Sequence, residues 1–249
     1  MSSTATDAGC SYPLSLLPTL ALDINAVDSR VALPYLMAFM KNAFIRALNH
    51  VYETSFQLQP GDSRVQHFIH YAKSAIELLR VHMEGDCLFF TTCTEGQSLV
   101  EALGPTCCPD AEHVIEALVT LSDTLAKWMK NPNSYSADVL RDHLSFGHIL
   151  VACMHAQIDY LSFHRLSATI SDADLRQMIH TNVEWFASNS DISFLLPFVI
   201  SHHDPSTSSY WPPIRKEGIE ALPVLLKAHE DCWQFAPFDP LTKLPTVVH

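Results

Sequence analysis

The stretch that decides the fold is residues 64–90, RVQHFIHYAKSAIELLRVHMEGDCLFF. Its apolar residues recur three or four positions apart, which is the period of one face of a helix. They are Ile69, Ala72, Ile76, Leu79 and Met83. The stretch therefore predicts one long helix. Near its end His82 and Asp86 stand four positions apart, so they share a face of that helix.

Three further segments predict helices by the same period. They are residues 34–54, residues 110 to about 130, and residues 136 to about 166. Pro34 stands near the start of the first segment, where a helix tolerates proline, and Asp110 is a good N-cap for the second. No alternating strand pattern competes with these helices. Four helices of roughly 20 to 30 residues joined by polar loops predict an all-α chain folded as an up-down-up-down four-helix bundle.

The rest of the chain predicts two flanking regions. Residues 1–30 are expected to form an N-terminal arm, and residues 31–249 a single helical domain. Within this domain the bundle takes residues 34–166, and residues 171–249 are expected to pack as a lid against one end of it. The lid carries helical patterns around residues 173–189 and near residues 216–230, with proline-rich stretches beside them.

Composition and charge exclude some classes of partner. The 249 residues are 48% hydrophobic and 17% charged, and the formal net charge is −12. Such an acidic chain lacks the basic face that nucleic acids and anionic membranes require. No apolar stretch is expected to span a bilayer. We therefore expect no nucleic-acid partner and no membrane span, while the oligomeric state stays open.

The cysteines and the N-terminus predict a reduced, cytoplasmic protein. The seven cysteines are Cys10, Cys87, Cys93, Cys107, Cys108, Cys153 and Cys232. An odd number with irregular spacing is not a secreted disulfide framework, and no CxxC pair offers a structural zinc site. The first apolar run has no basic residue ahead of it and contains two prolines, which is not typical of a signal peptide.

Six segments, in this order and at this spacing, resemble the fungal hemerythrin-like proteins. They are MAFMKNAFIRALNHVY (37–52), VHMEGDCLFF (81–90), EHVIEALVTL (112–121), MHAQIDYL (154–161), LLPFVISHHD (195–204) and FAPFDPLTKLP (235–245). The resemblance covers most of residues 34–245 and implies a hemerythrin-like bundle. In that family, histidines and carboxylates from all four helices hold two irons in the bundle core.

The family's ligand positions match this sequence only in part. His82 and Asp86 match the histidine and the acid of the second helix, although a one-residue ambiguity places the acid at Gly85 instead. His113 matches the first ligand of the third helix. The remaining ligand positions fall at Lys41, Ala117, Cys153 and Gln157. The resemblance therefore implies a metal site that has lost its function.

Lys41 is the most informative of these changes. An ammonium has no lone pair, so at a ligand position it competes with a metal cation. Burying a charge alone is prohibitive, whereas a hydrogen-bonded ion pair is tolerable. We expect Lys41 to pair with Asp86, flanked by His82 and His113. The alternatives are that Lys41 reaches the surface, and that the His82 and Asp86 pair simply faces solvent.

These residues predict a metal-free enzyme that acts on a small, largely apolar molecule in the bundle core. The candidate catalytic residues are Lys41, His82, Asp86 and His113. The candidate substrate-binding residues are Phe44, Leu48, Phe146, Leu150, Cys153, Gln157 and Tyr160. We expect neither a metal nor another cofactor. Holding a flexible chain in a reactive shape suits a cyclisation, an isomerisation or a pericyclic (Diels–Alder type) step. The resemblance to a fungal family implies secondary metabolism as the setting.

Two other functions remain open from the sequence. A hemerythrin-like protein that handles oxygen, iron or nitric oxide would need His82, Asp86 and His113 to converge with further ligands such as Glu84 or Glu116. A non-catalytic scaffold would keep the fold alone and fill its interior with side chains.

Other histidines are interpreted as structural or solvated. His67 with His70, and His148 with His155, have helical spacing but no carboxylate at a matching offset on the same face. His202, His203 and Asp204 follow an apolar run, which favours a structural role. His229, Glu230 and Asp231 are expected to form a solvated helix end.

Overall fold

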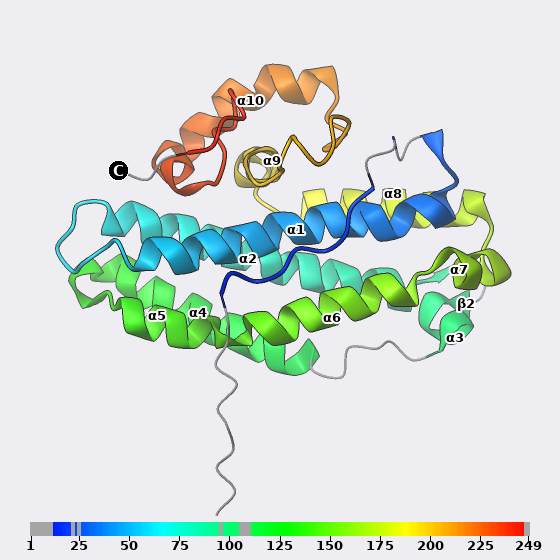
Figure 1. The fold of residues 1–249 in the computed structure, drawn as a ribbon, viewed down its shortest axis with the longest axis horizontal. Helices are drawn as coiled ribbons and strands as arrows, with labels where there is room; N and C mark the ends of the chain where they lie inside the picture. The colour runs from blue at the N-terminus through cyan, green and yellow to red at the C-terminus, as the bar shows by residue number, and fades with distance from the viewer. Residues whose placement is uncertain (1–11, 21–22, 24–25, 95–96, 105–110, 247–249) are drawn as a thin grey trace, which may run out of the picture.

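The computed structural model describes residues 12–20, 23, 26–94, 97–104 and 111–246, and these residues form an almost entirely helical protein (Figure 1). Its α-helices are α1 (Ser29–Ser55), α2 (Val65–Thr91), α3 (Leu99–Leu103), α4 (Ala111–Lys130), α5 (Ala137–His143), α6 (Gly147–Tyr160), α7 (Phe163–Thr169), α8 (Asp172–Ser188), α9 (Ile192–Ser201) and α10 (Lys216–Ala228). The 3₁₀ turns among the described residues are η2 (Pro132–Ser134), η3 (Leu144–Phe146) and η4 (Glu230–Phe235). Two short antiparallel strands, β1 (Cys93–Thr94) and β2 (Gln97–Ser98), pair Cys93 with Ser98. The all-α prediction is confirmed.

The long helices α1, α2 and α4 and the α5–α6 segment run side by side (Figure 1). The first two predicted helices correspond closely to α1 and α2. Helix α1 begins earlier than expected because the carboxylate of Asp28 accepts a hydrogen bond of 2.8 Å from the backbone N–H of Arg30 and caps the helix. The third predicted helix corresponds to α4, and its expected cap, Asp110, lies outside the described residues.

The predicted fourth helix, 136 to about 166, is broken in two places. The tight turn η3 separates α5 from α6, and Ser162, in an extended conformation, separates α6 from α7. Gly147 opens α6 where the N-terminal residues cross it. A Cβ at this glycine would lie 2.6 Å from the Tyr12 hydroxyl and 2.9 Å from a methyl of Leu14. The crossing segment therefore requires a glycine here, which the helical period alone does not reveal.

The N-terminal segment is bound to α1 by two asparagine side chains. The amide of Asn42 accepts from the Leu17 N–H at 2.7 Å and donates to the Leu17 carbonyl at 2.9 Å. Asn49 makes the same pair of bonds with Leu14, at 2.6 and 3.0 Å. Both leucine side chains are buried. Each amide thus pairs with both the N–H and the carbonyl of one leucine, as a neighbouring strand would. This part of the predicted N-terminal arm therefore belongs to the core.

The C-terminal region lies along α1 and α2 instead of covering one end of the bundle, so the expected position of the lid was wrong. Helices α9 and α10 lie above the middle of α1 in Figure 1, and α8 packs against α1 and α2. Phe198 of α9 packs against Phe44 with ring centroids 5.2 Å apart, and Phe235 of η4 packs against Phe68 at 5.5 Å. The region completes the hydrophobic core because fully buried aromatic rings join it to both helices.

Helix α1 is long and apolar enough to cross a membrane by length and composition, which differs from the sequence expectation that no segment is. In the most apolar window of α1, 61% of the residues are buried inside the protein. A core helix covered on several sides has this composition because nearly every face of it meets apolar neighbours.

Candidate functional site

Lys41, Asp86 and His82 form a polar cluster between α1 and α2, as the sequence predicted. Lys41 is almost completely buried, with 1% of its surface exposed, and its ammonium donates a hydrogen bond to Oδ2 of Asp86. Nζ of Lys41 lies 3.5 Å from Nε2 of His82. Nε2 of His82 in turn lies 3.7 Å from Oδ2 of Asp86. The two alternatives, a surface lysine and a solvent-facing histidine–acid pair, are therefore wrong.

Burial and charge set the protonation of this cluster. Burial lowers the pKa of His82 from 6.5 to about 4, so the imidazole is neutral at pH 7. Burial alone would raise the pKa of Asp86, but the Lys41 ammonium outweighs this effect and holds the pKa below its usual value. The cluster is therefore an ammonium–carboxylate ion pair beside a neutral imidazole.

A pocket of about 330 Å³ opens beside this cluster. His82, Asp86 and Asn182 are its polar side chains, and the remaining walls are apolar. The apolar side chains come from α1, α2, α8, α9 and the Trp211–Ile214 segment: Leu33, Leu36, Met37, Met40, Phe89, Ile179, Val183, Phe186, Ala187, Ile192, Leu195, Leu196, Val199, Trp211, Pro212, Pro213 and Ile214. Lys41 does not line the pocket and lies behind Asp86. A small apolar molecule would meet a carboxylate and an imidazole at one wall only.

Gly85 lets α8 approach α2 at this pocket. A Cβ on Gly85 would lie 2.9 Å from the ring of Trp185, and the side-chain amide of Asn182 donates to the Gly85 carbonyl at 2.7 Å. The residue that the resemblance treats as a possible lost acid therefore has a packing role. It allows α8 to form one side of the pocket.

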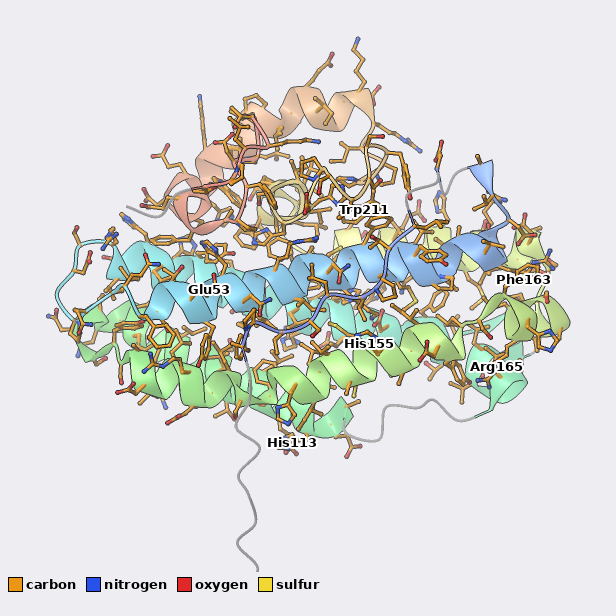
Figure 2. All side chains as sticks on the ribbon, viewed as in Figure 1. Glu53, His113, His155, Phe163, Arg165 and Trp211 are labelled. Carbon is orange, nitrogen blue, oxygen red and sulfur yellow. The ribbon has the colours of Figure 1, made fainter. Side chains whose placement is uncertain are left out.

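The structure places His113 away from the cluster. Its side chain is exposed on α4, at the lower edge of the molecule in Figure 2. The buried face of α4 is set by residues spaced three and four apart: Val114, Leu118, Leu121 and Leu125. A helix rotates by about 100° per residue, so His113, next to Val114, turns away from that face. The prediction that His113 flanks the Lys41 and Asp86 pair was wrong for this reason, and His113 does not line the pocket.

The expected substrate-binding residues do not line the pocket either. Phe44, Leu48, Phe146, Leu150 and Tyr160 are buried in the hydrophobic core. Among them, Phe44 supports the cluster, since its ring lies 5.0 Å from that of His82, and the hydroxyl of Tyr160 donates to the Gly104 carbonyl.

The two polar residues expected on the fourth helix do not form the pocket. Cys153 is buried and disulfide-bonded, so it offers no thiol and differs from the expectation of fully reduced cysteines. Gln157 is partly buried on α6 and does not line the pocket. The four-helix core is filled by side chains, and the pocket lies on the other side of α1 and α2.

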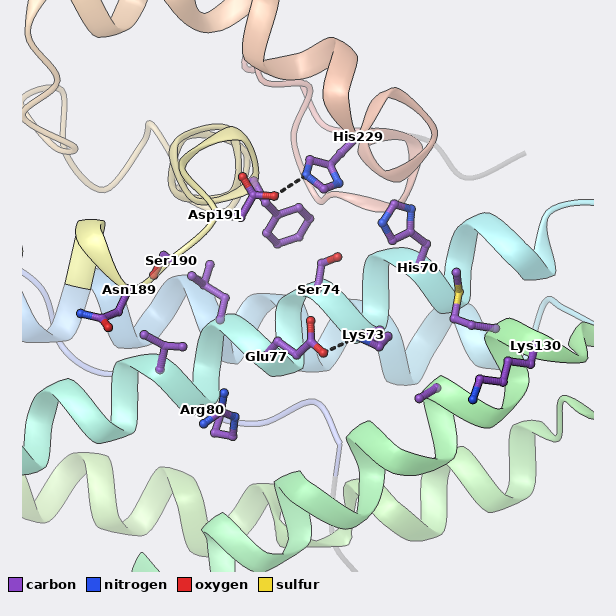
Figure 3. A pocket seen from close by; sticks show the side chains of 15 residues that line it. His70, Lys73, Ser74, Glu77, Arg80, Lys130, Asn189, Ser190, Asp191 and His229 are labelled. Carbon is purple, nitrogen blue, oxygen red and sulfur yellow. Dashed lines mark hydrogen bonds and ion pairs between the residues drawn. The ribbon is translucent and has the colours of Figure 1, made fainter. Parts of the chain in front are cut away.

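A second pocket, of about 690 Å³, lies between α2, the end of α4, and α9 with the residues that follow α10 (Figure 3). His229 faces it and is not the solvated helix end that the sequence predicted, because only 13% of its side chain is exposed. Its Nε2 lies 2.9 Å from Oδ2 of Asp191, and its ring lies 5.4 Å from that of His70. The sequence did not predict this grouping. The three-residue spacing between His229 and Cys232 is the signal in the sequence that could have indicated it.

His202 and His203 have the structural role that the sequence favoured. His202 is fully buried, and its Nε2 lies 2.6 Å from the Tyr71 hydroxyl while its Nδ1 lies 2.8 Å from the Phe198 carbonyl. His203 binds the Ser208 carbonyl at 2.8 Å.

The chain matches no family model, no curated protein and no solved structure.

Proposed function

We propose that this protein is a hemerythrin-like up-down-up-down helical bundle that has become a metal-free, cytoplasmic enzyme. Its substrate is a small, largely apolar molecule, bound in the pocket between α1, α2, α8 and α9. The reaction is an isomerisation, a cyclisation or a pericyclic step, and the resemblance to a fungal family favours secondary metabolism as the setting. The observation that carries the proposal is an apolar pocket whose polar side chains, among the described residues, are His82, Asp86 and Asn182.

The buried ion pair supports the absence of a metal from this cluster. The ammonium of Lys41 lies against both Asp86 and His82, where a cation shared by these two ligands would lie. Two cations at that distance would repel strongly in a buried site. The alternative of an iron-binding protein also requires His113, which is exposed on another helix face. The alternative of a non-catalytic scaffold is not favoured, because a pocket of substrate size with converging polar side chains lies beside the bundle core.

The polar wall suits hydrogen bonding and not electron transfer. Because the Lys41 ammonium is the nearest group to Nε2 of His82, the lone pair lies on Nε2 and we assign the ring proton to Nδ1. Among the described residues, Nδ1 of His82 has no protein hydrogen-bond partner. It can therefore donate to a carbonyl or hydroxyl oxygen of a bound molecule, while Asp86 accepts from a substrate hydroxyl.

The shape of the pocket supplies the remaining catalytic effect. A flexible unsaturated chain confined by rigid apolar walls loses its extended conformers before reaction, so less entropy is lost on the way to the transition state. An isomerisation or ring closure of this kind keeps every atom of the substrate, and the polar wall only redistributes charge at one oxygen. In this reaction Lys41 is a positioning residue, because it contacts Asp86 and His82 but does not line the pocket.

Binding in the pocket is tested with N-phenyl-1-naphthylamine, a neutral dye whose fluorescence rises in apolar surroundings. Val183 on α8 lines the pocket and is 60% exposed, so V183W fills the pocket without changing the core. The matched control is V119W, because Val119 is 46% exposed on α4 and does not line the pocket. We expect a single saturable site that V183W weakens at least about tenfold and V119W leaves intact. Equal affinities for the two variants would contradict the proposal.

Catalysis is tested with a set of linear polyene ketones, and the products are analysed by chromatography and mass spectrometry. We expect a product of unchanged mass and altered retention, formed faster with the wild-type protein than with H82Q. The control variant is H113Q, which alters an exposed histidine outside the pocket. Equal rates for wild type and H82Q would remove His82 from the mechanism.

A further inference from the structure

Three side chains that offer metal ligands lie together at one end of the second pocket, and two of them, His70 and His229, line it. His70 of α2, His229 and Cys232 of η4 place one nitrogen or sulfur atom each within 4.8 Å of one another. Cys232 is fully buried and has a free thiol, while the two histidines are partly buried. Two imidazoles and one thiol form a donor set that suits Zn²⁺ better than Mg²⁺ or Ca²⁺, which prefer oxygen ligands.

His229 has the hydrogen-bonding arrangement of a metal ligand. Its Nε2 lies 2.9 Å from Oδ2 of Asp191 and 3.2 Å from the Ser193 hydroxyl. An N–H at Nε2 that donates to the carboxylate leaves the lone pair on Nδ1. This buried Nδ1 has no hydrogen-bond partner among the residues that the structure describes. Metal-bound histidines usually donate their other N–H to a carboxylate in this way. The unpaired lone pair is a second observation in favour of a ligand at this position, because buried acceptors are seldom left unpaired.

The distances require only a small adjustment of the side chains. Around one tetrahedral zinc, with bonds of about 2.0 to 2.3 Å, neighbouring ligand atoms lie about 3.3 to 3.6 Å apart. The three atoms here lie within 4.8 Å of one another, so no pair of ligand atoms must approach by more than about 1.5 Å. Figure 3 shows the rings of His70 and His229 next to each other at one end of the pocket. The half-buried ring of His70 has room to turn into the pocket that it lines.

We propose that His70, His229 and Cys232 form a Zn²⁺ site, with Asp191 as the residue that orients His229. Three protein ligands leave the fourth position open, and His70 and His229 line the pocket of about 690 Å³. Zinc sites with three protein ligands and an open position bind a water molecule or a small ligand there. This site is separate from the Lys41, His82 and Asp86 cluster, and it does not rest on the function proposed for that cluster.

The test uses the full-length protein after dialysis against a chelator, with Co²⁺ as a spectroscopic substitute for Zn²⁺. We expect one Co²⁺ per chain with visible d–d bands and a thiolate-to-cobalt charge-transfer band in the near ultraviolet, and Zn²⁺ displaces both. The charge-transfer band should vanish in C232S and persist in C87S, because Cys87 is an exposed free cysteine outside the site. A band that survives in C232S, or no band in the wild type, would overturn the proposal.

The histidine ligands are tested by Zn²⁺ affinity and thermal unfolding. We expect H70Q and H229Q to abolish the single tight site and H67Q to retain it, because His67 lies one turn before His70 and pairs with Asp231 instead. D191N should weaken binding by about 10- to 100-fold, as loss of an orienting carboxylate does. At roughly 100 times the Kd, Zn²⁺ should raise the Tm of the wild type by about 5 to 10 °C. Equal Zn²⁺-induced Tm shifts in wild type and H70Q would contradict the site, even where C232S fails to fold.

Discussion

At the scale of single residues, the buried ion pair makes Lys41 a determinant of stability. In K41M the carboxylate of Asp86 stays buried without its cation, so we expect a loss of about 3 to 5 kcal/mol in the free energy of unfolding. The double variant K41M/D86L removes both charges and should recover most of that loss. Urea unfolding measures both. The control is K73M, since Lys73 pairs with Glu77 near the surface and should cost about 1 kcal/mol or less. A K41M variant as stable as K73M would contradict the buried pair.

The buried histidines make stability depend on pH. Burial lowers the pKa of His202 from 6.5 to about 3, so the unfolded chain takes up a proton near pH 6.5 while the folded chain does not. The contribution of His202 is fully present above pH 6.5 and is lost as the pH falls toward 3. Between pH 6.5 and 4 we expect wild type to lose on the order of 2 to 4 kcal/mol more than H202Q. Urea midpoints across this range measure the difference, and H164Q, at an exposed histidine, should follow wild type.

The polar cluster could be predicted from the sequence only through family positions. The spacing of His82 and Asp86 puts them on one face of α2, but nothing in that spacing identifies Lys41 of α1 as their partner. His113 shows the limit of the same reasoning, because the apolar positions from Val114 to Leu125 already turn it outward. Local periodicity was the better guide there than the resemblance.

At the scale of elements, the N-terminal segment depends on two asparagines of α1. Asn42 is 1% exposed, and its amide satisfies both backbone groups of Leu17. In N42A these groups lose their partners, so we expect a loss of about 2 to 4 kcal/mol and faster amide exchange at Leu17. Hydrogen exchange read by mass spectrometry measures this change. N133A, at an exposed asparagine, should leave the exchange rate of Leu17 unchanged.

The helices were easier to predict than their junctions. The period of apolar residues locates α1, α2 and α4 closely, because each buries one continuous face over many turns. The breaks between α5, α6 and α7 depend on contacts with distant residues, such as Tyr12 and Leu14 against Gly147. A pattern within one segment holds no information about such a crossing.

At the scale of the whole molecule, the C-terminal region and the bundle share one core. Phe235 is fully buried against Phe68 and Tyr71 of α2. We expect F235A to cost about 3 to 5 kcal/mol and to lower stability in a single cooperative transition. Calorimetry checks this, with F163A as the control because Phe163 is 49% exposed. Two separate transitions in F235A would mean that the C-terminal region unfolds on its own.

The pocket could not be predicted because its walls come from distant parts of the chain. Met40 and His82 meet Val183, Leu195 and Trp211 there, and only the packing of α8 and α9 brings them together. The sequence expectation instead placed the cavity between the four long helices, where Phe44, Leu48 and Leu150 fill the space.

The Lys41 ammonium also changes what the protein requires from its environment. A metal bound at Asp86 would have to be taken up from the surroundings, could exchange with other proteins and could be removed by a chelator. Lys41 instead provides a positive charge that is covalently part of the chain. Every molecule therefore carries one such charge, and it cannot dissociate. The ion pair around Asp86 is therefore complete once the chain has folded, whatever metal ions the surroundings supply.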